Sequence, residues 1–157
     1  MTFDTTTVSL REINADSVRA VTALAVRDDQ RAFVASNAIS LAQALFAPEA
    51  WYRAIHAGDE LAGFVMLYDE SLREPCPARP AVSVWRFMID ARFQRRGVGR
   101  AALTRVIEHV RAKALFTTLE LSYVPAPGGP EPFYRRLGFE PTGRVDDGEV
   151  VLALVLR

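Results

Sequence analysis

Two periodicities of apolar and polar residues run through the chain, and each predicts a type of element. Residues 8–13, VSLREI, alternate apolar with polar side chains, which is typical of a strand with one buried face. Between residues 97 and 111 the apolar side chains return every three to four positions, with Val98, Ala102 and Val106 along one line. That spacing puts them on a single face and predicts an amphipathic helix.

Two Gly/Asp steps next to apolar segments favour tight turns. Segments 51–57 and 60–69 flank Gly58-Asp59 and are expected to form a hairpin, and 150–156 follows Asp147-Gly148 in a second one. The last segment, VVLALVL, is apolar throughout and is expected to be buried on both faces. The other predicted elements are a helix at 15–26 capped by Asn14, a helix at 37–46 that stops before Pro48, strands at 81–90 and 118–124, and a short helix at 131–137 that begins at Pro130 and ends at Gly138.

The order of these elements predicts a mixed α/β fold. The helix at 97–111 lies between the strands at 81–90 and 118–124, and a strand–helix–strand connection makes two strands parallel. The other strands are joined by hairpins and are therefore antiparallel. No repeat, low-complexity tract or long linker interrupts the sequence, so residues 1–157 are expected to form one domain.

Composition narrows the class of protein further. Half of the 157 residues are apolar, and 19 acidic side chains balance 19 basic ones. A net charge of zero gives no general attraction to nucleic acid or anionic membranes, so we expect neither as a partner. The N-terminus does not resemble a signal peptide, and no segment approaches the ~20 apolar residues of a membrane helix, so we expect a cytoplasmic protein. One cysteine and two histidines are too few for a structural zinc site, and no metal is expected.

The most informative segment is the turn before the helix at 97–111, QRRGVGR. Gly97 and Gly99 let the backbone approach a ligand closely, and the first turn of a helix presents unpaired N–H groups and a partial positive charge. Such a helix start suits a phosphate group. The arginines around the glycines can pair with further phosphates: Arg92, Arg95, Arg96 and Arg100.

Other interpretations of this turn fit the sequence less well. Residues 97–102 also match the dinucleotide pattern G-x-G-x-x-A, with Glu120 at a suitable distance, but six residues separate Gly97 from the preceding strand and too little chain remains for a second half-domain. A Walker loop would need a Gly-Lys-Ser/Thr step, which the chain lacks. A nucleic-acid-binding helix would expose the apolar face that the core requires, and a plain helix start would leave the arginines solvated.

The turn also carries a family resemblance. Residues 94–99, QRRGVG, resemble the Q/R-x-x-G-x-G/A signature of the GNAT superfamily of N-acetyltransferases, and 132–139, PFYRRLGF, is similar to the family's second signature. The order of predicted elements agrees with this family over the whole chain. The segments that resemble the bacterial diamine and spermidine/spermine N-acetyltransferases more specifically are 27–46, 63–68, 84–90 and 142–151.

The resemblance implies a fold, a cofactor and site residues. The fold would be a mixed, mostly antiparallel sheet of about seven strands with flanking helices. Acetyl-CoA would thread between the two parallel strands, which would splay around it, and its pantetheine amides would pair with the backbone of Phe87, Met88 and Ile89. Tyr134 would be the general acid that protonates the departing thiolate, although it also fits a core tyrosine of a short helix. The residues expected around the pyrophosphate are Gln94, Arg95, Arg96, Gly97, Val98, Gly99 and Arg100.

The chain departs from the family pattern at two places. Pro127 and Pro130 stand where many members have asparagine and alanine, so the coenzyme contacts of this loop do not follow from the resemblance. Trp85 stands where some members have a carboxylate that acts as the general base. The candidates for that base are a water chain or one of three carboxylates: Asp28, Asp29 and Glu120.

The resemblance implies a small primary amine, such as a diamine or polyamine, that attacks acetyl-CoA directly in a ternary complex. Asp28, Gln30 and Asn37 are the expected substrate-binding residues, and helix capping explains Asn37 equally well. The alternatives are other amine acceptors, a protein N-terminus among them, and a non-catalytic acyl-CoA sensor. Homodimers are common in the family. Further carboxylates lie in segments that the family uses as substrate walls: Glu49, Asp69 and Glu70.

Overall fold

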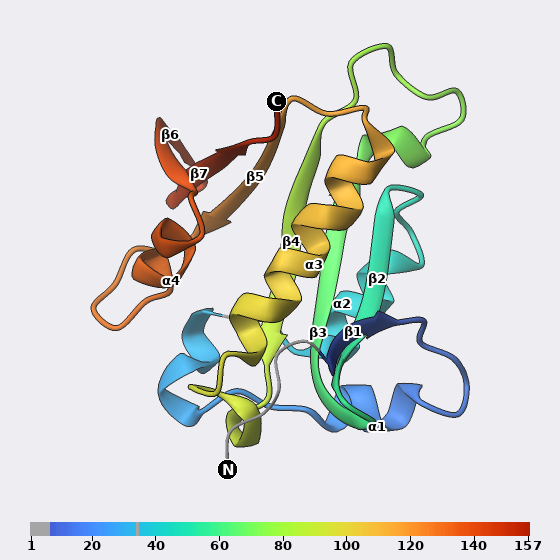
Figure 1. Ribbon diagram of the computed structural model, residues 1–157, viewed down its shortest axis with the longest axis vertical. Coiled ribbons are helices and arrows are strands. Elements are labelled where there is room, and N and C mark those ends of the chain that lie inside the picture. Colours follow the sequence, from blue (N-terminus) through green and yellow to red (C-terminus); the bar gives the residue numbers. More distant parts are fainter. Residues whose placement is uncertain (1–6, 34) are drawn as a thin grey trace.

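The computed structural model describes residues 7–33 and 35–157. Within these residues seven strands form one sheet in the order β1-β2-β3-β4-β5-β7-β6 (Figure 1). The strands are β1 (Val8–Arg11), β2 (Ala50–Ala57), β3 (Glu60–Asp69), β4 (Val82–Ile89), β5 (Thr118–Tyr123), β6 (Glu140–Asp146) and β7 (Glu149–Val155). The helices are α1 (Val18–Ala23), α2 (Asn37–Ala44), α3 (Val98–Lys113) and α4 (Glu131–Arg136), with short 3-10 helices at Asp28–Phe33, Glu70–Leu72 and Ala91–Phe93.

The parallel pair predicted from the sequence is β4 with β5. Ser83 and Val84 pair with Glu120 and Leu121, whereas the other neighbouring strands of the described sheet are antiparallel. Beyond these residues the described parts of the two strands are not paired, and Figure 1 shows β5, β7 and β6 diverging from β4. The mixed α/β fold and the crossover through α3 are therefore confirmed, and the divergence opens the sheet at its centre.

Helices cover both faces of the sheet. The apolar face of α3, which includes the fully buried Val98 and Val106, packs in one core cluster with strand residues such as Leu121. A second cluster on the other face joins Val21 of α1 to Phe64 and to partly buried side chains of α2. The predicted amphipathic helix is thus confirmed, because its apolar face belongs to the first cluster. Both hairpins are confirmed by the antiparallel pairing of β2 with β3 and of β6 with β7.

Some predicted elements differ from the structure in length, in capping or in burial. The helix expected at 15–26 is limited to α1, because Asn14 Oδ1 accepts hydrogen bonds from the backbone N–H groups of Asp16 and Ser17 and so stabilises a turn before the helix. Pro130 is the N-cap of α4 rather than its first residue. β7 is not buried along its whole length: Val155 is 65% exposed, since the pairing with β6 reaches no further than Ala153.

Candidate active site

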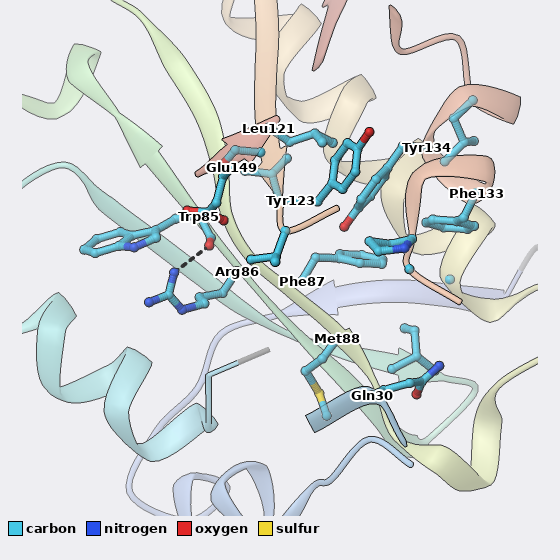
Figure 2. Close-up of a pocket in the computed structure, with 18 of the residues that line it drawn as sticks. Gln30, Trp85, Arg86, Phe87, Met88, Leu121, Tyr123, Phe133, Tyr134 and Glu149 are labelled. Carbon is cyan, nitrogen blue, oxygen red and sulfur yellow. Dashed lines mark hydrogen bonds between the residues drawn. The ribbon is translucent and has the colours of Figure 1, made fainter. Parts of the chain in front are cut away.

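The divergence of β4 and β5 opens a cavity of about 1380 Å³ (Figure 2). Successive side chains of a strand point to opposite faces, so the cavity has walls on both faces of the sheet. One wall, here called the α3 side, is formed by Gly97, Gly99, Phe133 and Tyr134. The wall on the opposite face, here called the α2 side, is formed by Tyr68, Trp85, Arg86, Glu120 and Glu149.

On the α3 side, Gln94 fixes the turn that precedes the helix. Its side-chain amide donates to Ile89 O at 2.9 Å and to Gln30 Oε1 at 2.7 Å, which ties the turn to the end of β4 and to the 3-10 helix at Asp28–Phe33. Gly97 is the N-cap of α3 and has a φ of 79°, a conformation that a residue with a Cβ disfavours. The first N–H groups of α3 have no partner within the helix, and this first turn of the helix lies at the cavity wall.

The same wall carries positive charge and little side-chain bulk. A Cβ at Gly99 would lie 3.4 Å from Ile89 Cγ1 and 3.5 Å from Phe133 Cζ, so a longer side chain would project into the space between β4 and α4. Arginines from the turn, α3 and α4 line the cavity: Arg95, Arg100 and Arg136. A helix start, a glycine-lined surface and several guanidinium groups together fit a pyrophosphate.

α4 adds an aromatic pair, Phe133 and Tyr134, to the α3 side. The Phe133 ring lies 6.2 Å from the ring of Phe87 and 5.4 Å from that of Tyr134, measured between centroids. In Figure 2 the Tyr134 hydroxyl points toward the space between Tyr123 and Phe87. No described residue hydrogen-bonds this hydroxyl, and burial raises the pKa of Tyr134 to about 12. The phenol is therefore protonated throughout the neutral range.

On the α2 side, Tyr68 and Trp85 form an aromatic wall. Their rings meet edge to face with centroids 5.7 Å apart. The Tyr68 hydroxyl donates to Glu49 Oε2 at 3.0 Å, and Arg73 donates to both Glu49 at 2.8 Å and Tyr68 at 3.2 Å. The hydrogen bond from Arg73 is the main cause that holds the pKa of Glu49 below its usual range. This network fixes the Tyr68 hydroxyl, and the Tyr68 side chain lines the cavity.

Arg86 is the cation of β4 on the α2 side. Its guanidinium donates to Trp85 O at 2.9 Å and to Gln43 Oε1 at 3.2 Å, and its buried Nε has no hydrogen-bond partner in the described chain. Burial lowers the pKa of Arg86, and the charge of Glu149 partly opposes that shift. The side chain is thus anchored to β4 and α2, next to the cavity.

Carboxylates reach the same side from β5, β6 and β7. Arg144 of β6 binds Glu120 at 2.9 and 3.2 Å and also contacts Asp146 at 3.4 Å. Glu149 begins β7 and also lines the cavity, yet no described residue forms an ion pair or a hydrogen bond with its carboxylate. The α2 side therefore offers one carboxylate that other side chains do not hold.

Most of the predicted coenzyme residues lie together. Val98 is fully buried in the core, so it can present only its backbone to a ligand, and Arg96 is not part of the cavity wall. Of the loop before α4, Gly128, Gly129 and Pro130 line the cavity and Pro127 does not. The predicted residues that line it with Tyr134 are Phe87, Met88, Ile89, Gln94, Arg95, Gly97, Gly99 and Arg100.

The predicted substrate residues separate. Gln30 lines the cavity, where it accepts the hydrogen bond from Gln94. Asp28 does not: it is exposed and pairs with Arg31 at 3.2 Å. Asn37 does not line the cavity either, because it is buried and donates to Val21 O at 2.9 Å, a bond that satisfies a polar group in the core.

The other carboxylates considered from the sequence are held in ion pairs. Asp29 is exposed and lies 3.4 Å from Arg27, while the buried Asp69 accepts from Lys113 at 2.6 Å. Glu49 and Glu70 both contact Arg73. None of these four lines the cavity, whereas Glu120 does.

Sequence reasoning missed Phe133, Arg86 and Glu149. Phe133 and Arg86 are direct neighbours of the predicted residues Tyr134 and Phe87, so the motifs could have found them. Glu149 had one weak signal, a charge at the first position of an otherwise apolar strand. Its importance depends on the packing of β7 beside β5, which no local pattern reveals.

Two other features, a membrane-spanning helix and a cluster of metal ligands, are absent from the described residues. Their helices include none with the length and apolar character needed to cross a membrane. They also bring together no group of three or more histidine, cysteine, aspartate or glutamate side chains that could hold a metal ion.

Comparisons with known proteins agree with this fold. A model of the acetyltransferase (GNAT) family matches residues 11–139. The spermine/spermidine N(1)-acetyltransferase of Bacillus subtilis (strain 168) is 27% identical over 161 residues, which cover 92% of this chain and 96% of that protein. A GNAT acetyltransferase of Elizabethkingia anophelis solved with acetyl-CoA bound has a TM-score of 0.65 at 16% identity and covers 95% of this chain and 98% of its own. The ribosomal-protein-S18-alanine N-acetyltransferase of Escherichia coli has a TM-score of 0.68 at 15% identity and covers 95% and 94%.

Proposed function

The chain belongs to the acetyltransferase (GNAT) family, and we propose that it transfers the acetyl group of acetyl-CoA to a primary amine. One observation carries the proposal: the start of α3, the diverging strands β4 and β5, and Tyr134 all line a single cavity. We extend the proposal to the chain as one catalytic domain, 1–157, since the described strands form one sheet.

The α3 side is the proposed coenzyme site. The N–H groups at 95–100, with Arg95 and Arg100, would bind the pyrophosphate, and Gln94 would hold the turn in place. The backbone of Phe87, Met88 and Ile89 would pair with the pantetheine arm, since β4 has no partner on this edge beyond its pairing with β5. Acetyl-CoA supplies an activated thioester, and these residues would orient it.

Tyr134 is the proposed general acid. The amine nitrogen forms a bond to the acetyl carbon, the carbon–sulfur bond breaks, and the sulfur leaves with a negative charge that needs a proton. A phenol with its pKa raised to about 12 stays protonated and can supply that proton. Phe133 packs beside the ring, Phe87 packs beside Phe133, and this stack would keep the ring in place.

The α2 side is the proposed entry for the acceptor. Direct attack from this side needs no covalent enzyme intermediate, and the only cysteine, Cys76, is exposed and is not part of the cavity wall. Asp28 and Asp29 do not line the cavity and Glu120 is bound to Arg144, so water is the favoured base. Similarity to the Bacillus spermine/spermidine acetyltransferase supports a diamine or polyamine as acceptor.

The release of free CoA from acetyl-CoA across a panel of amines tests this function. We expect release above the amine-free rate with at least one class of primary amine, diamines first. A protein that binds acetyl-CoA and releases no CoA with any amine would instead be an acyl-CoA sensor.

A further inference from the structure

Glu149 differs from the other carboxylates of the cavity in having no cationic partner. Glu120 and Asp146 share Arg144 at 2.9 and 3.4 Å, whereas no described residue pairs with the Glu149 carboxylate. Glu149 is half-buried and lines the cavity, and Figure 2 shows it on the same side as Trp85 and Arg86. A partly desolvated carboxylate without a partner favours a cationic ligand.

Strand alternation fixes the side of the sheet that Glu149 faces. Its neighbour Val150 packs against the core cluster of α3 and pairs with Tyr123 of β5. Glu149 therefore points to the opposite face, as Glu120 does beside Leu121. Tyr134 belongs to the α3 side, so Glu149 and the proposed acid line the cavity from opposite faces of the sheet.

Arg86 forms no ion pair with Glu149. The charge of Glu149 acts on Arg86 through space, but no salt bridge or hydrogen bond joins the two described side chains. Its guanidinium donates instead to Trp85 O and to Gln43 of α2. Arg86 thus keeps its own anchors, and Glu149 stays available to a ligand.

We infer that Glu149 binds a second ammonium group of the acceptor, away from the nitrogen that is acetylated; this rests on the proposed function. A carboxylate in contact with an ammonium stabilises its charged form, which cannot attack a thioester. The nitrogen that attacks must first lose its proton, whereas a distant ammonium can keep its charge in contact with the carboxylate and orient the acceptor. Glu149 is accordingly the residue that selects diamines over monoamines.

The test compares acceptors that differ by one charge. Initial rates are measured with a diaminoalkane and with the alkylamine of equal chain length, for the wild type, Glu149→Gln and the matched control Glu120→Gln. We expect Glu149→Gln to lower kcat/KM for the diamine roughly 10- to 100-fold, mainly through KM of the amine, and to change kcat/KM for the alkylamine far less. Glu149→Asp should retain part of the preference, and Glu120→Gln should change the diamine-to-monoamine ratio less than Glu149→Gln does.

Thermal melting and acetyl-CoA titration of each variant separate a folding defect from a lost contact. An unchanged diamine-to-monoamine ratio in a folded Glu149→Gln would overturn the inference while leaving the proposed function intact. A preference for ω-amino acids over diamines that Arg86→Gln abolishes would also overturn it, because the cavity would then select a carboxylate. If the wild type acetylates no amine at all, the proposed function itself fails.

Discussion

At the scale of single residues, the proposed chemistry depends on Tyr134. Its hydroxyl has no hydrogen-bond partner among the described residues, and burial raises its pKa to about 12. The free acceptor amine loses its proton near pH 10, below the ionisation of this phenol. The proposed rate should therefore rise with pH as the amine deprotonates, and Tyr134 should remain an acid over that whole range.

Tyr134→Phe should lower kcat on the order of 10²–10⁴-fold and leave KM for acetyl-CoA nearly unchanged, because the proton is needed only as the thiolate leaves. Steady-state kinetics with a confirmed amine acceptor checks this. The hydroxyl makes no hydrogen bond to the described chain, so the melting temperature should not fall. A variant with wild-type kcat would remove Tyr134 from the mechanism.

At the scale of elements, the start of α3 should decide coenzyme binding. Gly99→Glu would place a negatively charged side chain between β4 and α4, where a Cβ is already in contact with Ile89 and Phe133. We expect a loss of acetyl-CoA binding in titration calorimetry with a folded circular dichroism spectrum. Gly97→Glu should also lose binding, and its φ of 79° adds a strain of about 1 kcal/mol.

Gly58→Glu is the matched control for that strain. Gly58 has a φ of 61° in the turn between β2 and β3, with open space around its Cβ position and no part in the cavity wall. The control should lower the melting temperature about as much as Gly97→Glu and bind acetyl-CoA normally. Full affinity in Gly99→Glu would show that the turn does not bind the coenzyme.

The element scale also marks the limit of prediction from sequence. Alternation, turn residues and the stripe along α3 predicted both hairpins and the crossover, because each depends on side chains within a short segment. Asn14 misled the prediction, since its side chain bonds to Asp16 and Ser17 and delays the helix. The family resemblance implied strands that splay, and the divergence of β4 from β5 confirms it. The approach of Glu149 depends on packing between distant strands, and only the fold reveals it.

At the scale of the whole molecule, the stability should depend on pH through two partly buried histidines. The His109 ring stacks on Trp51 at 4.2 Å, its Nε2 is buried without a hydrogen-bond partner, and burial lowers its pKa below 6.5, as do the charges of Lys113 and Arg53. Burial also lowers the pKa of His56. A depressed pKa in the folded state means that stability is complete above pH 6.5 and is lost as the pH falls below it.

We expect the melting temperature to fall between about pH 7 and pH 5, where each kcal/mol corresponds to about 2–4 °C for a chain of this size. His109→Gln should make that fall shallower, because one of the two partly buried histidines no longer takes up a proton. Scanning calorimetry across this range checks it. An identical pH dependence in the variant would assign the acid sensitivity to other groups.

The central claim is direct acetyl transfer from acetyl-CoA to an amine in one ternary complex. Mass spectrometry of a single reaction can quantify free CoA, the N-acetylated amine and the intact protein together. Direct transfer should give equal amounts of CoA and acetylated amine and leave the protein unmodified. Without the amine, CoA release should not exceed the uncatalysed background. Acetyl on the protein, or CoA released without a matching acetylated amine, would contradict it.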